Sequence, residues 1–303
     1  MRQLVDTVMV EQRAVSFTRR SIKTDSKDRG LRLVLSMIDL TTLEGKDSDE
    51  KVRSLCRKAI TPWEGEITPQ LPSVAAVCVY PTLVTTAKRE LEGSGVQVAS
   101  VATGFPSGQY PISVRIEDVT NAVAAGADEI DMVINRGAFL SGHYDEVADE
   151  IKQVRLACGS AHLKIILETG ELETFENVRV ASDLAIEAAA SAGPISDGEV
   201  FIKTSTGKVS PAATMPVTLV MLDAIQSYFD KTGVRIGMKP AGGIRTAKQA
   251  LHYLVMVKET LGNEWLTPDL FRFGASSLTN DVLRQLVRLH TGRYAASYDF
   301  SEA

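Results

Sequence analysis

The sequence predicts a single α/β barrel, and two observations support this fold class. Short runs of apolar, strand-forming residues alternate strictly with longer helical patterns, as expected of βα units built around a parallel sheet. Eight such runs occur in 303 residues, which is the number of strands and a suitable length for a (β/α)8 or TIM barrel with insertions. An open, doubly wound sheet is the alternative architecture.

The expected strands are spread along most of the chain. They are Leu33–Asp39, Val74–Tyr80, Val96–Thr103, Ala127–Asn135, Leu163–Thr169, Glu199–Ser205, Arg235–Ala241 and Leu270–Ala275. Two kinds of residue mark the ends of the intervening helices. Side-chain oxygens at helix starts accept hydrogen bonds from the first backbone N–H groups, and glycines at helix ends adopt the left-handed conformation that stops a helix. They are Asp47 with Glu50, Thr174, Thr214, Thr246 and Thr279 at helix starts, and Gly233 and Gly262 at helix ends.

Three segments are expected. Residues 1–30 form an N-terminal extension with a weak helical pattern, which packs outside the barrel or forms a tail. Residues 31–291 form the (β/α)8 catalytic barrel, and residues 292–303 form a short C-terminal tail. Chain termini that are poor in apolar residues are commonly loosely held.

Composition excludes several classes of partner. The net charge of −5 and the scattered lysines and arginines give no basic patch for nucleic acid or for a membrane surface. No apolar run approaches the ~18 residues that span a bilayer. The three cysteines lie far apart, as in a protein with reduced thiols, so a cytoplasmic location is expected. A homodimer is compatible with the sequence, which does not determine an assembly.

Charged residues interrupt five of the expected strands. Parallel strands in a barrel are covered on both faces and should be almost continuously apolar. The interruptions are Asp39, Asp131, Lys164, Lys203 and Lys239. One strand lysine could be a snorkelling side chain, but three on successive strands require pairing or function, because burying an uncompensated ammonium costs several kcal/mol.

Crowded lysines at the carboxyl ends of barrel strands suggest imine chemistry. Each ammonium lowers the proton affinity of its neighbour, and a neutral lysine can attack a carbonyl. Spacing does not decide which lysine is the nucleophile, although Lys203 lies on the middle strand of the three. Gly237, two residues before Lys239, is expected to leave room below that lysine.

A phosphate site is expected in the loops that follow the last three strands. Glycines there allow a close approach of the backbone to an anion, and loops after strands seven and eight often bind phosphate. Each loop alone could be a simple tight turn. The loops are Thr204-Ser205-Thr206-Gly207-Lys208, Pro240-Ala241-Gly242-Gly243 and Phe273-Gly274-Ala275-Ser276-Ser277.

Metal and cofactor chemistry are not indicated. None of the four histidines pairs at metal-ligand spacing, and HExxH, Walker A, GxGxxG and GxSxG motifs are absent. We therefore expect no metal and no cofactor.

At these motifs the sequence resembles the deoxyribose-phosphate aldolase family, in its longer form, from about Leu31 to Tyr298. The matching segments include Ile38-Asp39-Leu40-Thr41-Thr42-Leu43, Cys78-Val79-Tyr80-Pro81, Gly126-Ala127-Asp128-Glu129-Ile130-Asp131, Glu168-Thr169-Gly170-Glu171-Leu172, Phe201-Ile202-Lys203-Thr204-Ser205-Thr206-Gly207-Lys208 and Lys239-Pro240-Ala241-Gly242-Gly243. The resemblance implies a lyase of deoxyribonucleotide catabolism that reversibly cleaves 2-deoxy-D-ribose 5-phosphate to acetaldehyde and D-glyceraldehyde 3-phosphate through a Schiff base.

The resemblance also implies roles for individual residues. Lys203 would form the Schiff base, Lys239 would keep it partly neutral, and Asp131 would move protons. Lys164 would orient Asp131, and Asp39 would complete the polar network. The substrate-binding residues would be Cys78, near the substrate but not a nucleophile, and the phosphate-site residues Thr206, Gly207, Lys208, Gly242, Gly243, Gly274, Ser276 and Ser277.

One departure concerns the C-terminus. The compact bacterial form ends at a tyrosine that helps proton transfer, whereas here five residues follow Tyr298, so its role is open. Two rival functions are also compatible with the sequence. One is a transaldolase-like enzyme acting on longer sugar phosphates, and the other is a barrel that binds a sugar phosphate without reaction. Two adjacent buried lysines argue against the second, and trapping of an imine with acetaldehyde would discriminate between the readings.

Overall fold

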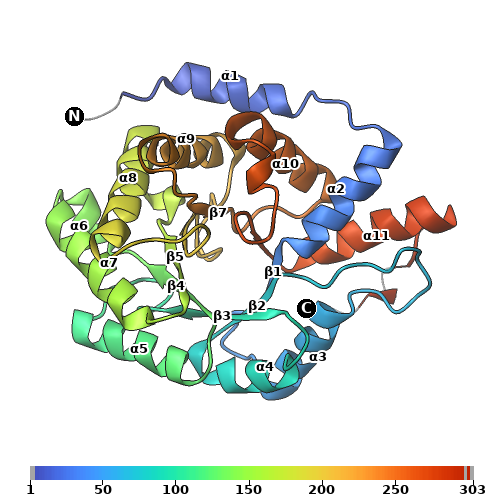
Figure 1. Ribbon diagram of the computed structural model, residues 1–303, viewed down its shortest axis with the longest axis horizontal. Coiled ribbons are helices and arrows are strands. Elements are labelled where there is room, and N and C mark those ends of the chain that lie inside the picture. The colour runs from blue at the N-terminus through green and yellow to red at the C-terminus, as the bar shows by residue number, and fades with distance from the viewer. Residues whose placement is uncertain (1–3, 297–298, 301–303) are drawn as a thin grey trace.

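The computed structural model describes residues 4–296 and 299–300, and its centre is a ring of eight parallel strands (Figure 1). The strands are β1 (Ile38–Thr41), β2 (Ala76–Val79), β3 (Gln97–Ala102), β4 (Glu129–Val133), β5 (His162–Ile166), β6 (Val200–Lys203), β7 (Gly237–Lys239) and β8 (Phe273–Ala275). Each strand pairs with its sequence neighbour, and β8 returns to β1. Two isolated bridges, Met238 to Phe271 and Ala241 to Gly274, join β7 to β8, so the barrel predicted from the sequence is confirmed.

Helices surround the barrel and cover the outer faces of its strands (Figure 1). They are α1 (Thr7–Phe17), α2 (Thr24–Ser36), α3 (Asp49–Ile60), α4 (Val84–Glu90), α5 (Ile112–Ala124), α6 (Arg136–Leu140), α7 (Tyr144–Cys158), α8 (Phe175–Ser191), α9 (Met215–Thr232), α10 (Ala247–Leu261) and α11 (Ser277–Thr291), with short 3-10 turns η1 (Pro81–Leu83), η2 (Thr169–Glu171) and η3 (Asn263–Trp265). No helix in this described part of the chain is both long and apolar enough to cross a bilayer.

The predicted first strand is wrong over its first residues. Leu33–Ser36 belongs to the last turn of α2, and β1 begins at Ile38. The apolar run Leu33-Val34-Leu35 resembles a buried strand, but Leu31, Val34 and Leu35 are buried at the i, i+3, i+4 spacing of one helix face. The other seven expected strands each contain the observed strand or, for β5, all of it but its first residue.

Most predicted helix boundaries are confirmed by side-chain caps. Thr174, Thr214 and Thr246 each accept a hydrogen bond from the backbone three residues on, and Gly233 ends α9 in a left-handed conformation. The start of α3 was misplaced, because Ser48 is the N-cap in place of Asp47. The carboxylate of Asp47 instead accepts from the Thr42 hydroxyl and the Glu44 backbone N–H. The start predicted at Thr279 was also late, since α11 begins at Ser277.

The N-terminal extension packs on the outside of the barrel. The buried face of α1 is Val10, Ala14 and Phe17, and it lies against α9 and α10 (Figure 1). Ion pairs from Arg13 to Asp223 and from Arg20 to Glu259 hold it there, as exposed or half-exposed contacts of modest strength. Since α2 runs across residue 30, the extension and the barrel share a helix.

Candidate active site

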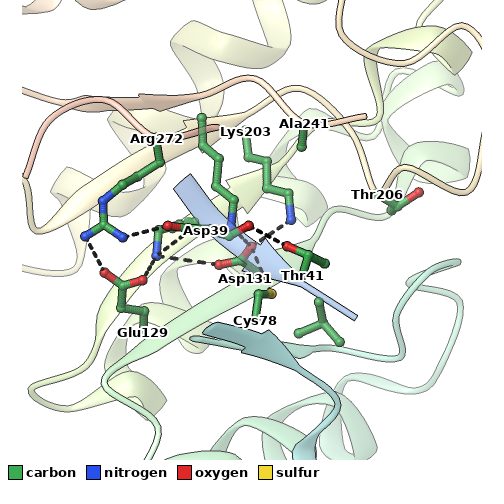
Figure 2. A network of polar contacts seen from close by, with 12 residues as sticks. Asp39, Thr41, Cys78, Glu129, Asp131, Lys203, Thr206, Ala241 and Arg272 are labelled. Atoms are coloured by element: carbon green, nitrogen blue, oxygen red, sulfur yellow. Dashed lines mark hydrogen bonds and ion pairs between the residues drawn. The ribbon is translucent and has the colours of Figure 1, made fainter. Parts of the chain in front are cut away.

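The five charged strand residues converge inside the barrel, toward the carboxyl ends of the strands. Asp131 Oδ2 accepts hydrogen bonds from Lys203 Nζ and from Lys239 Nζ, each at 2.7 Å (Figure 2). Lys239 Nζ also lies 2.5 Å from Asp39 Oδ2, and Lys164 Nζ lies 3.7 Å from Asp131 Oδ1. Parallel register makes this possible, since Lys203 is paired with Lys239 and Asp131 with Lys164 across adjacent strands.

The network also includes two residues that sequence reasoning missed, Glu129 and Arg272. Arg272 donates to Asp39 Oδ1 at 2.7 Å and to Glu129 Oε1 at 3.0 Å, while Glu129 forms a close ion pair with Lys164 (Figure 2). Glu129 could have been found, because it lies two residues before Asp131 and therefore faces the same side of β4. Lys164 is thus held mainly by Glu129, with Asp131 at a longer distance.

Burial and pairing separate the proton affinities of these groups. Burial alone would raise the pKa of Asp131, but Lys203, Lys239 and Lys164 together hold that pKa far below its usual range. Burial would lower the pKa of Lys239, but Asp131 and Asp39 raise it above its usual value. Burial lowers the pKa of Lys203, since Asp131 offsets the effect of burial only in part and Lys239 opposes the charge of the ammonium.

Of this network, Lys203 alone lines the cavity at the barrel mouth. The cavity, of about 550 Å³, opens at the barrel mouth beside the Lys203 ammonium group, whereas Asp39, Asp131, Lys164 and Lys239 are fully enclosed. Desolvated amines next to open space suit attack on a carbonyl. The rest of the cavity is formed largely by the loops after β1, β6, β7 and β8.

The expected room below Lys239 is absent. A Cβ on Gly237 would lie 2.5 Å from the Phe201 ring, so that ring occupies the space. Phe201 packs beneath two cations, with its ring centre 5.5 Å from Lys164 Nζ and 5.9 Å from the Arg272 guanidinium. The glycine therefore admits an aromatic floor for the charged network.

All of the predicted phosphate-loop residues lie on the cavity wall. They are Thr206, Gly207, Lys208, Gly242, Gly243, Gly274, Ser276 and Ser277. Three of the glycines have positive φ, of +80°, +76° and +82° for Gly207, Gly242 and Gly243, so the loop path depends on residues without a Cβ. Ser276 is the N-cap of α11, and the helix N-terminus adds partial positive charge at the cavity.

Two acidic residues hold the basic and hydroxyl groups of this rim. Lys208 Nζ lies 2.8 Å from Glu44 Oε1, and both side chains are partly exposed, so an incoming anion would compete with Glu44 for the lysine. Glu168 is buried and accepts from both the backbone N–H and the hydroxyl of Thr206. Glu44 and Glu168 were not singled out from the sequence. Glu44 lies in a loop, where acidic residues are ordinary, and Glu168 lies near the end of the predicted strand Leu163–Thr169 but follows the observed strand, which ends at Ile166.

Cys78 lies outside the wall of this cavity. Its side chain is fully buried, and its Sγ is 4.0 Å from Asp131 Oδ2. Burial and the neighbouring carboxylate raise the pKa of the thiol to about 11, so it is protonated near neutral pH. Cys78 is not one of the residues that line the cavity, so its predicted position near the substrate remains a prediction.

Tyr298 lies outside the described residues, so its predicted role remains a prediction. Within residues 4–296 and 299–300, no group of three or more histidine, cysteine, aspartate or glutamate side chains is arranged to hold a metal ion.

Comparisons with known proteins agree with the geometry. Residues 33–283 match the DeoC/LacD family of aldolases. Over 289 residues, the chain is 50% identical to the deoxyribose-phosphate aldolase of Mus musculus and 48% identical to that of Homo sapiens, covering 93% of this chain and 88% of each relative. The solved deoxyribose phosphate aldolase from Aeropyrum pernix shares the fold, with a TM-score of 0.63 at 22% identity over 95% of this chain and 100% of that one. The chain therefore belongs to the DeoC/LacD aldolases and, within them, to the metal-independent, Schiff-base-forming deoxyribose-phosphate aldolases.

Proposed function

We propose that Lys203 is the residue that forms the Schiff base during cleavage of 2-deoxy-D-ribose 5-phosphate. The observation that carries this assignment is access: of the buried lysines in the charged network, Lys203 alone lines the cavity. Its ammonium has one carboxylate partner, Asp131, whereas Lys239 has two. Lys203 is therefore the amine that is both reachable and easily deprotonated.

The reaction follows from this assignment. The neutral Lys203 amine attacks C1 of the open-chain sugar, and loss of water gives a protonated imine. Removal of the C3 hydroxyl proton breaks the C2–C3 bond, the electron pair moves into the imine to form an enamine, and D-glyceraldehyde 3-phosphate leaves. Protonation of the enamine and addition of water then release acetaldehyde and regenerate the amine.

Asp131 is the proposed proton carrier. Its Oδ2 accepts from both Lys203 and Lys239, while its Oδ1 accepts no hydrogen bond from any described residue. Oδ1 is the atom that can accept or return protons, directly or through water, as carbinolamine and imine form. Asp39 and Lys164 keep Asp131 in place and ionised, through Lys239 and through the longer contact to Oδ1.

The glycine-rich rim is the proposed phosphate site. Backbone N–H groups near Gly207, Gly242 and Gly243, the hydroxyls of Ser276 and Ser277, and the Lys208 ammonium surround one end of the cavity that ends at Lys203. A 5-phosphate bound there would place the sugar carbonyl toward the lysine. Partial charges at a helix N-terminus stabilise such an anion.

A small sugar phosphate is the proposed ligand, without nucleic acid, membrane or metal, and the cytoplasm is the proposed compartment. The net charge of −5 and the three buried free thiols support both proposals. A homodimer is compatible with them.

Borohydride reduction in the presence of acetaldehyde tests the central assignment. Reduction should add one ethyl group to one lysine, and peptide mass analysis should locate it on Lys203. Labelling of Lys239 or Lys164 in its place would overturn the assignment. Trapping by longer ketose phosphates but not by acetaldehyde would support a transaldolase-like enzyme, and absence of any trapping would support a binding protein.

A further inference from the structure

The buried ion pairs inside the barrel join seven groups into one network of unequal charge. The carboxylates are Asp39, Glu129 and Asp131, and the cations are Lys164, Lys203, Lys239 and Arg272. If all seven were ionised, four positive charges would face three negative ones. All seven groups are buried, so water screens the excess positive charge poorly. The excess charge therefore favours loss of a proton from one of the cations.

The carboxylate partners of each cation determine which cation loses its proton most readily. Arg272 keeps its proton at any accessible pH and contacts two carboxylates. Lys239 lies between Asp39 and Asp131, and Lys164 is paired closely with Glu129. Lys203 has one carboxylate partner, which it shares with Lys239, and so it holds its proton least firmly.

We propose that Arg272 and Glu129 are positioning residues that set the charge of this network, with Arg272 supplying the surplus positive charge that keeps Lys203 neutral. Arg272 touches neither the cavity nor Lys203 and acts through Asp39, whose Oδ1 it occupies while Lys239 takes Oδ2 (Figure 2). Glu129 fixes Arg272 and Lys164 on the side of the network away from Lys203. This inference rests on the proposed role of Lys203 and extends it.

Titratable groups inside and outside the network face Lys203. Those inside the barrel are Asp131 on β4, Lys239 on β7, Lys164 on β5, Asp39 on β1 and the Cys78 thiol on β2. Those outside the network are Glu44, Lys51, Lys208 and Arg245 at the cavity rim, with Glu168 behind Thr206. The rim groups border a solvent-filled opening and are screened. Glu168 contacts Thr206, and burial raises the pKa of the Glu168 carboxyl group, which favours its neutral form. The enclosed network therefore dominates the charge at Lys203.

The test is the pH dependence of imine trapping with acetaldehyde and cyanoborohydride. Acetaldehyde has no titratable group, so the rising limb of the trapping rate reports the protein. In Arg272→Met the network would hold three charges of each sign, and the limb should move to higher pH by about half a unit to one unit, the size expected for one removed neighbouring charge. Arg272→Gln, which keeps hydrogen-bond donors without the charge, should shift it equally and serves if the methionine variant does not fold.

Two controls separate charge from packing. Arg272→Lys should leave the limb near its original position, because it keeps the charge in a different shape. The double variant Arg272→Met with Glu129→Gln restores an excess of one positive charge and should return the limb to within about 0.3 units, because loss of a cation and loss of a carboxylate change the proton affinity of Lys203 in opposite directions. A structural role alone predicts lower rates at every pH, no movement of the limb, and a double variant worse than either single one.

The outcomes also distinguish this inference from the proposed function. A label found on a lysine other than Lys203 in the unmodified protein would overturn the assignment of the nucleophile itself. A label on Lys203, with the limb unmoved in a folded Arg272→Met or Arg272→Gln variant, would overturn the charge-setting role alone.

Discussion

The carboxyl ends of β6 and β7 lie side by side and each carries a lysine, yet the two lysines differ in almost every property that matters for catalysis. Lys203 and Lys239 are register partners, and both donate to Asp131 Oδ2 at 2.7 Å. Lys203 borders the cavity, and burial lowers its pKa. Lys239 is enclosed, and two carboxylates raise its pKa.

The difference has a simple origin in the neighbouring strands. Asp39, on β1, reaches Lys239 at 2.5 Å, and no second carboxylate pairs with Lys203 among the described residues. One extra carboxylate thus raises the pKa of Lys239, whose positive charge then lowers the proton affinity of Lys203. Two buried lysines at neighbouring positions can therefore play different roles, because the number of carboxylate partners sets the proton affinity of each.

Removal of the nucleophile should give the largest effect. Lys203→Ala should abolish imine trapping and lower cleavage by about 10⁴-fold or more, since covalent catalysis is lost outright. Lys203→Arg is the matched control, because it keeps the positive charge beside Asp131 but cannot form an imine. Comparable activity in the arginine variant would mean that the charge, and not the amine, is what the site needs.

The proton donor to the enamine is the next test, since Asp131 serves both lysines and Tyr298 is the alternative predicted from the sequence. If the Tyr298 hydroxyl relays protons, Tyr298→Phe should slow exchange of acetaldehyde methyl protons with deuterated water by about 10²-fold, the range of a general acid–base group. Trapping at Lys203 should persist. An exchange rate within a factor of about two of the original would assign the step to Asp131 and water.

Lys239→Leu tests the comparison itself. Loss of the neighbouring cation should raise the pKa of Lys203, so the rising limb of the trapping profile should move up by about one unit or more. The variant should also melt at a lower temperature, because Asp39 and Asp131 lose a shared partner, and breaking such a buried pair costs about 3–5 kcal/mol. A folded variant with an unchanged profile would refute the electrostatic account.

A smaller effect is expected at the phosphate rim. Gly242 has φ of +76°, and a Cβ there would lie 2.8 Å from Ala212 Cβ and 3.1 Å from Gly207 Cα. Gly242→Ala should therefore displace both loops and raise KM for the phosphorylated substrate by about tenfold, the equivalent of one lost contact. Gly233→Ala is the control, because that glycine has φ of +74° but open space and no place in the cavity. Equal KM values for the two variants would argue against a phosphate role for Gly242.

Chelation should have the smallest effect. Exhaustive EDTA treatment should leave cleavage within a factor of about two, since lysine and carboxylate groups supply the chemistry. If chelation abolished cleavage and zinc restored it, a metal ion in place of an imine would have to activate the substrate carbonyl.

The sequence predicted those parts of the site that violate a local rule. A charge inside an apolar strand is such a violation, so Asp39, Asp131, Lys164, Lys203 and Lys239 were all found, and the glycine-rich loops were recognised by their turn chemistry. Glu129 and Arg272 break the same rule, since they lie inside the predicted strands Ala127–Asn135 and Leu270–Ala275, but they were not singled out. In the structure each lies at or just before the start of its strand, where a charged residue is ordinary. The fold class followed from the alternation of strands and helices.

Other features depend on contacts that one sequence does not record. Asp39 and Lys239 are 200 residues apart, and only closure of the barrel between β7, β8 and β1 brings them together. The Phe201 ring that fills the space beside Gly237 is set by the packing of adjacent strands, so a missing side chain was mistaken for a void. The first strand was misplaced because an apolar triplet fits a helix face as well as a strand.

Direct titration of the lysines tests the central claim that Lys203 loses its proton at a lower pH than Lys239 does. Lysine side chains labelled with ¹⁵N at Nζ can be followed by NMR from about pH 5 to about pH 11, with Lys203→Ala and Lys239→Met used to assign the two signals. We predict that the Lys203 signal titrates well below the ordinary lysine value of about 10.4, and that the Lys239 signal stays in its protonated form across the range. A Lys203 signal that titrates at or above the ordinary value, or a Lys239 signal that titrates first, would contradict the account.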